Sequence, residues 1–167
     1  LQREYLNRTG EEIKIEDMIY EIRGKHVMLD SDLARLYECA NGTKSINLAV
    51  NRNNERFPAD FYFQLTKEEY NNLKFQIETS NSNNNHGGVR KLPYVFTEQG
   101  VAMLATVLRT RVASQISVAI MRAFVKMRKY ISSNLIEQKY INNLVLEDHN
   151  KIKLLEASFQ KIEEKRK

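Results

Sequence analysis

Four polar or basic side chains recur at helical spacing between residues 43 and 55. They are Lys44, Asn47, Asn51 and Arg52. Spacings of three and four residues bring side chains onto one face of an α-helix. Asparagine amides and an arginine guanidinium can hydrogen-bond to base edges in the major groove of DNA, and a lysine can neutralise a phosphate. The segment has the chemistry of a recognition helix, although Leu48 and Glu55 on the same face fit base readout poorly.

A short helix is predicted at residues 30–38, ahead of this segment. Its apolar side consists of Leu33, Leu36 and Tyr37. Asp30 or Ser31 can serve as the N-cap, and Asp32 suits the first turn of a helix. Asp30 and Asp32 could also suggest a metal pair, but helix capping is the simpler explanation of both residues.

The second helix is predicted to begin near Thr43, a good N-cap, after the turn signal Asn41-Gly42, and to end before Pro58. A helical projection gives it a buried face of Ile46, Ala49, Val50, Asn53 and Phe57. We expect Asn53 to make a structural hydrogen bond from that face. A first helix, a turn and a second helix with a polar outer face form the arrangement that inserts a recognition helix into DNA.

Three segments are predicted to be β-rich: a hairpin around Arg23-Gly24-Lys25 within 19–29, a strand in 60–66 and a strand in 89–97. In the second of these, Phe61, Phe63 and Leu65 share one face, which leaves Tyr62 as the exposed aromatic residue that could stack on a single-stranded base. Helices are predicted at 66–78 and 98–108, the latter capped by Thr97. The polar stretch 79–88 is predicted to be a flexible loop or a wing tip. The fold class is therefore α+β, as a small winged-helix-like domain.

Positive charge is concentrated in one part of the chain. Residues 79–136 contain eight basic residues and one acidic residue, whereas the whole chain carries +5. Such segregation is expected of a phosphate-binding face, but also fits a solvated helix surface whose acidic partners lie elsewhere in space. Further candidate DNA contacts are Arg56, Arg90, Lys91, Arg109 and Arg111. Arg56 could instead pair with Asp60.

The last third of the chain has the spacing of a coiled-coil seam. Its members are Ile141, Val145, Ile152, Leu155, Phe159 and Ile162, with Asp148 as a defect. We interpret residues 132–167 as a dimerisation helix. The alternatives are a helix that packs on its own domain or one that frays at its charged end.

Catalysis and metal binding find little support in the sequence. The three histidines are scattered, Cys39 is the single cysteine, and no phosphate-binding loop or hydrolase motif occurs. We expect no enzyme activity and no cofactor.

No apolar run is long enough to span a membrane, and no signal peptide is recognisable, so a cytoplasmic location is expected. The chain begins with Leu, so it could be a fragment of a longer protein.

Three segments in order carry a family resemblance: IRGKHVMLDSDLARLY, NRNNERFPADFYFQLTKEE and GGVRKLPYVFTEQGVAMLATVL. They resemble the phage ORF-six N-terminal domain, a relative of the KilA-N and BRO-N domains of phages, large DNA viruses and mobile elements. The resemblance covers roughly residues 18–130 and implies a DNA-binding domain of regulators or antirepressors, without a catalytic site. The turn at 38–42 is longer than the usual LYG-type connection, which leaves the angle between the two helices open.

These observations predict three regions: an extension at 1–17, the DNA-binding domain at 18–131 and the coiled-coil helix at 132–167. The expected partners are double-stranded DNA and a second copy of the chain. The alternative is a protein-interaction module, an antirepressor that binds a repressor protein through its coiled coil or its basic face.

Overall fold

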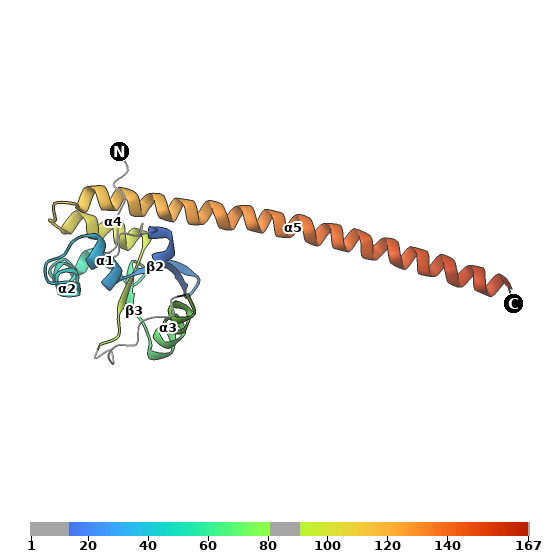
Figure 1. The fold of residues 1–167 in the computed structure, drawn as a ribbon, viewed down its shortest axis with the longest axis horizontal. Coiled ribbons are helices and arrows are strands. Elements are labelled where there is room, and N and C mark those ends of the chain that lie inside the picture. The colour runs from blue at the N-terminus through green and yellow to red at the C-terminus, as the bar shows by residue number, and fades with distance from the viewer. Residues whose placement is uncertain (1–13, 81–90, 167) are drawn as a thin grey trace. The chain divides into compact units, whose positions relative to one another are not determined.

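The computed structural model describes residues 14–80 and 91–166. Along the sequence the chain divides into two units, with the boundary between Val125 and Lys126. The first unit contains a four-stranded antiparallel sheet with helices on both of its sides, and the chain ends in a long helix (Figure 1). The α+β class and the long C-terminal helix predicted from the sequence are confirmed.

The sheet has the strand order β1-β2-β4-β3, so β4 lies in its interior. The strands are β1 (Ile19–Ile22), β2 (Lys25–Leu29), β3 (Tyr62–Gln64) and β4 (Tyr94–Thr97). The hairpin of β1 and β2 was predicted correctly. Its two turn residues, Arg23 and Gly24, have φ of 54° and 70°, as a type I′ turn requires. Strands β3 and β4 also pair, but helix α3 separates them along the chain.

Two consecutive helices follow β2, as predicted: α1 (Asp30–Leu36) and α2 (Thr43–Arg52). Their caps differ from the prediction. Asp30 is the first residue of α1 and not its N-cap, and Gly42 occupies the cap position of α2. Helix α2 is also shorter than the predicted 43–55, because a 3₁₀ turn, η2 (Asn54–Arg56), replaces its last turn before the proline.

Helix α3 (Lys67–Ser80) begins with a capping box. The Glu69 amide donates to Thr66 Oγ1 at 3.1 Å, and the Thr66 amide donates to Glu69 Oε1 at 3.0 Å, which satisfies two amides at the start of the helix. One face of the sheet packs against α3 through a cluster that includes Val27, Leu73 and Val95. Figure 1 shows α3 on one side of the sheet and α4 on the other.

Helix α4 (Glu98–Val107) is capped by Thr97, as predicted, with its Oγ1 accepting from the Gly100 amide at 3.3 Å. Gly100 lies directly against the backbone before β3, because a Cβ there would be 2.0 Å from the carbonyl oxygen of Phe61. A short connection leads to α5 (Ala113–Arg166). The start of α5 belongs to the core of the first unit, where Ile116 and Ile120 are fully buried.

The prediction for Tyr62 needs correction. Its ring is half-buried and stacks on Tyr94, with 5.3 Å between the ring centroids, and it also packs against Phe57 and Phe96. A base could not use both faces of this ring, so Tyr62 is part of an aromatic cluster rather than a free stacking platform.

Candidate nucleic-acid interface

Helix α2 presents the polar face that its sequence spacing predicts. Lys44, Asn51 and Arg52 are exposed, and Asn47 is half-buried. The opposite face is held in the core by Ile46 and Val50, which are 0% and 2% exposed. This burial fixes the rotation of the helix about its axis, because turning it would expose both apolar side chains.

At the end of α2 the structure bears out the expectation for Asn53 and excludes one of the two interpretations of Arg56. Asn53 is half-buried and donates from Nδ2 to the Ala49 carbonyl at 2.8 Å, which is the predicted structural hydrogen bond. Arg56 is exposed, and its guanidinium forms no ion pair with Asp60, which is also described and exposed. Arg56 therefore keeps its hydrogen-bond donors available to solvent or to a phosphate.

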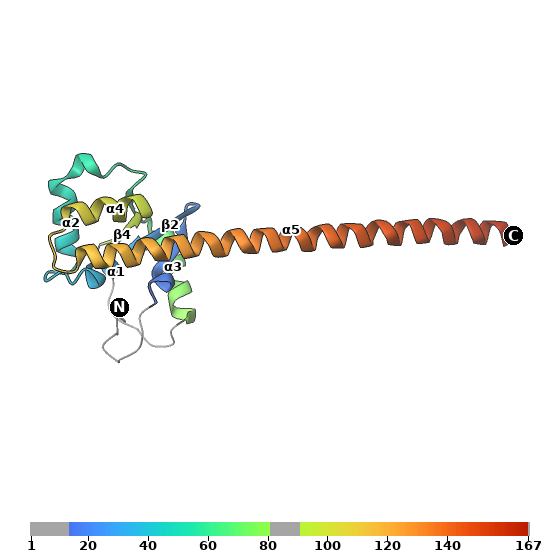
Figure 2. The ribbon, with the colours of Figure 1, turned by 90° about the horizontal axis from the view of Figure 1, so that it is seen from above.

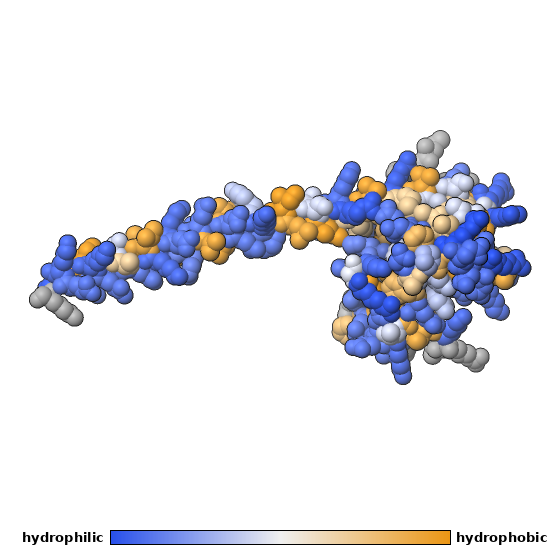
Figure 3. All heavy atoms as spheres, turned by 180° about the vertical axis from the view of Figure 1, so that it is seen from behind, coloured by the Kyte–Doolittle hydropathy of each residue, from blue (hydrophilic) through white to orange (hydrophobic). Residues whose placement is uncertain are grey.

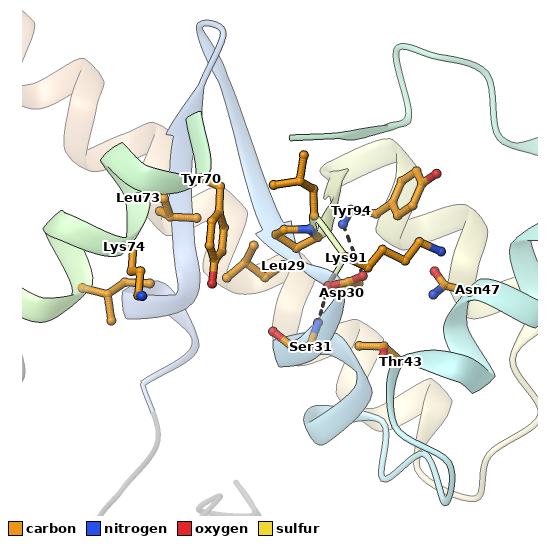
Figure 4. A pocket seen from close by; sticks show the side chains of 13 residues that line it. Leu29, Asp30, Ser31, Thr43, Asn47, Tyr70, Leu73, Lys74, Lys91 and Tyr94 are labelled. Atoms are coloured by element: carbon orange, nitrogen blue, oxygen red, sulfur yellow. Dashed lines mark hydrogen bonds between the residues drawn. The ribbon is translucent and has the colours of Figure 1, made fainter. Parts of the chain in front are cut away.

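Lys91 is brought next to α2 by the tertiary structure. It is exposed, its Nζ lies 5.7 Å from the centre of the Tyr94 ring, and it lines the same pocket as Asn47. Figure 4 shows the two side chains extending toward one another, Lys91 from the segment before β4 and Asn47 from α2. Arg90, the other predicted wing residue, lies outside the described residues, as does most of the predicted loop 79–88.

Arg109 and Arg111 are exposed in the connection between α4 and α5. Figures 1 and 2 both place this connection at the end of the first unit where α2 lies. The connection that carries Arg109 and Arg111 thus lies at the same end of the first unit as α2, which carries Lys44, Asn47, Asn51 and Arg52 (Figures 1 and 2). Two other exposed residues are Leu48 of α2, which is 49% exposed, and Glu55 just after it.

A pocket beside α2 was not predicted from the sequence. Asp30, Tyr70 and Lys74 line it, from α1 and α3. Burial is the main cause that raises the pKa of Asp30, while hydrogen bonds from the Tyr94 and Ser31 amides oppose the rise. The sequence signal for Asp30 was its position at the start of a helix, which predicts a capping role and gives no hint of a cavity.

Asp30 and Asp32, which could suggest a metal pair, have other partners. Asp30 accepts from two backbone amides, and Asp32 pairs with Arg35 at 2.6 Å. Within residues 14–80 and 91–166, no three His, Cys, Asp or Glu side chains are grouped so that they could hold a metal ion.

Cys39 is half-buried, and its burial raises the pKa of the thiol. No helix in the described part of the chain is both long and apolar enough to cross a membrane.

The predicted seam lies on the part of α5 that belongs to the second unit. Its apolar members are exposed to between 45% and 70%: Ile141, Val145, Ile152, Leu155, Phe159 and Ile162. Figure 3 shows apolar residues spaced among hydrophilic ones along this part of the helix. Asp148 lies within the seam and 4.0 Å from Lys151 one turn later.

Comparison with known proteins gives one positive result. The sequence model of one protein family, the ORF6N domain, matches residues 17–107, which contain the whole sheet and α1 to α4. The curated proteins and the solved structures that were searched contain no match. The matched stretch is more than half of the chain and includes all but the last of the residues that carried the resemblance in the sequence. The chain belongs to the ORF6N domain family.

Proposed function

We propose that this chain is a sequence-specific DNA-binding regulator of a phage or mobile element, of the transcriptional regulator or antirepressor type, with α2 as its recognition helix. Membership of the ORF6N family supports a phage-type regulatory or DNA-binding role. The observation that carries the proposal is the outward face of α2, where Lys44, Asn51 and Arg52 are exposed while the opposite face is buried.

Each of these side chains suits a particular contact with double-stranded DNA. Arg52 can bond bidentately to the O6/N7 edge of guanine, and Asn51 can bond to the N6/N7 edge of adenine. Lys44, in the first turn of α2, would neutralise a phosphate. Lys91 and Arg56 would add phosphate contacts on either side of the helix. No step of this mechanism needs a cofactor or a catalytic residue.

The second unit would allow two copies of the chain to form a dimer. Apolar side chains at alternating steps of three and four along a helix are unfavourable when exposed to water, and a partner that covers the seam would remove this cost. A second copy presents the same seam, and in a parallel pair Lys151 at a g position faces Glu156 at an e position of the other helix. Two copies would place two recognition helices on a target with two half-sites.

The test is fluorescence anisotropy of the chain with a random-sequence duplex of about two helical turns, titrated across salt concentrations. Binding should weaken as salt rises, with a log–log slope of about −0.9 per neutralised phosphate. Arg52→Ala should weaken binding, whereas Lys25→Ala, an exposed lysine of the β1–β2 hairpin, serves as the matched control. Equal losses in both variants, or no binding at low salt, would argue against α2 as the DNA contact.

A protein-interaction module is the second candidate, favoured by one observation. Leu48 is 49% exposed and Glu55 is exposed on the surface that would face DNA. An apolar and an acidic side chain suit a protein partner better than a phosphate backbone. An antirepressor of this kind would bind a purified repressor protein in high salt and after nuclease treatment, and Leu48→Asp would abolish that complex.

A further inference from the structure

A pocket of about 310 Å³ opens between α3 and the paired helices α1 and α2 (Figure 4). Its apolar lining includes Leu29 at the end of β2, Pro93 before β4 and Leu73 on α3. Small-molecule sites typically measure about 300–1,000 Å³ and combine an apolar lining with a few polar groups. This pocket is at the small end of that range, so it suits one ligand of about mononucleotide size.

The carboxylate of Asp30 is the most buried polar group in this lining. The residue is 5% exposed. Its Oδ1 accepts from the Ser31 amide at 2.8 Å and its Oδ2 accepts from the Tyr94 amide at 3.2 Å. A carboxylate has about four acceptor positions, so acceptor capacity remains on both oxygens. Asp30 forms no ion pair with a described side chain, and a ligand with two adjacent N–H donors could use the remaining capacity.

Two lysines give the pocket a positive rim. Lys74 of α3 and Lys91 before β4 are both exposed and line opposite sides of the opening. Together with Asp30 they leave the lining with a net charge of +1. A simple amine or guanidinium would bond to Asp30 but would be repelled by both lysines. An anionic ligand with a neutral donor edge satisfies all three groups.

Among the nucleobases, guanine has the matching edge. Its N1–H and N2–H are parallel donors, whereas adenine and cytosine each present a ring-nitrogen acceptor next to their amino group, and that acceptor would oppose a carboxylate oxygen. Uracil and thymine offer one N–H between two carbonyls. The ring of Tyr70, which stands on the α3 side of the pocket, provides a surface on which a base can stack.

We propose that this pocket binds a guanine nucleotide, with the base edge on Asp30 and the phosphate on Lys74 and Lys91. The nucleotide could be free in solution. It could also be a guanine extruded from the DNA beside α2, since Asn47 and Lys91 belong to both surfaces and extrusion is a known way to read a base. Only this second source rests on the proposed DNA-binding function.

The first experiment is calorimetric titration of the full chain with GMP, IMP and AMP. IMP lacks the N2 amine and AMP reverses the donor pattern, so both should bind at least about tenfold more weakly than GMP, because a buried acceptor left unpaired is costly. Lys74→Ala should weaken GMP binding about tenfold. Lys67→Ala, an exposed lysine of α3 that does not line the pocket, should leave it unchanged.

Asp30→Asn should remove the preference for GMP over AMP. Because Asp30 also holds the Ser31 and Tyr94 amides, circular dichroism and a melting curve must accompany this variant. If the variant unfolds, the comparison of GMP with IMP on the unaltered chain decides the same point.

The second experiment distinguishes the two sources of guanine. A DNA duplex with a fluorescent guanine analogue is mixed with the chain, and extrusion should raise the emission in the unaltered chain and in Lys67→Ala but not in Lys74→Ala. GMP binding without this rise identifies a free nucleotide, and the rise without GMP binding identifies an extruded base. Absence of both, or equal affinities for GMP and AMP, would overturn the proposal. The anisotropy assay reports separately whether DNA is bound at all.

Discussion

Arg23 and Glu69 form a bidentate pair that ties the β1–β2 turn to the start of α3. Arg23 Nε lies 2.9 Å from Glu69 Oε2, and Nη2 lies 2.8 Å from Oε1. The guanidinium also covers the ring of Phe63, at 4.3 Å from its centre. Glu69 closes the capping box of α3 with Thr66 as well, so the Arg23–Glu69 pair joins a turn, a strand and a helix.

This pair predicts a dependence of stability on pH. The hydrogen bonds from Arg23 are the main cause that lowers the pKa of Glu69 from 4.5 to about 2. A carboxyl group whose pKa is lower in the folded state stabilises the fold above its unfolded pKa, and the contribution is lost as the pH falls from about 4.5 to about 2.

Glu69→Gln should therefore lower the melting temperature at pH 7. The difference in melting temperature between this variant and the unaltered chain should shrink towards pH 2. Thermal unfolding followed by circular dichroism at several pH values measures this. Glu68→Gln, on an exposed neighbour of the same helix turn, is the control. A difference for Glu69→Gln that is constant with pH would contradict the assigned role of the pair.

Gly100→Ala should destabilise the first unit. The new Cβ would lie 2.0 Å from the Phe61 carbonyl oxygen, so α4 or the segment before β3 must move, at a cost of about 1–3 kcal/mol. Urea unfolding measures the change. Gln99→Ala, at an exposed position of the same helix, should leave stability nearly unchanged, and a similar effect of both substitutions would refute the close packing at Gly100.

Arg52 and Lys44 should differ in how their loss affects DNA binding. Lys44→Ala removes a phosphate contact, so it should weaken binding to all sequences alike and reduce the salt slope by about one phosphate. A target site is first obtained by selecting bound duplexes from a random-sequence pool. Arg52→Ala should cost about 1–3 kcal/mol on this selected site and relax the base preference at one position. Binding curves on the selected site and on a scrambled duplex measure both effects, and identical profiles for the two variants would contradict base readout by Arg52.

Asp148→Leu should strengthen self-association of the chain. Asp148 occupies a seam position of α5, where a charge must be desolvated when a second helix covers it. We expect the dimer dissociation constant to fall roughly tenfold or more, equivalent to about 1.4 kcal/mol. Sedimentation equilibrium measures this, with Glu147→Leu, outside the seam, as the control. No change, or an equal change in the control, would argue against a seam through residue 148.

Local signals were sufficient for much of this fold. Arg23-Gly24 predicted the hairpin, Thr97 predicted the start of α4, and the spacing of Ile46 and Val50 predicted which face of α2 is buried. Each of these depends on residues within one turn of helix or one reversal of the chain. The cap of α1 was predicted wrongly, because Asp30 bonds to Tyr94, 64 residues away, and local cap preferences contain no information about such a partner. The cap of α2 was also predicted wrongly, since Gly42, with a φ of 58°, takes the cap position instead of Thr43.

The sequence by itself determined the family, the α+β class, the polar face of α2 and the apolar spacing of α5. These features follow from side-chain chemistry and from the periods of helix and strand, which a linear sequence displays. Only the tertiary structure decided that β4 lies inside the sheet, that Lys91 reaches the side of Asn47, and that Asp30 lines a pocket with Lys74. Those arrangements join residues dozens of positions apart, and they arise because burying the whole apolar core at once selects one packing of the elements.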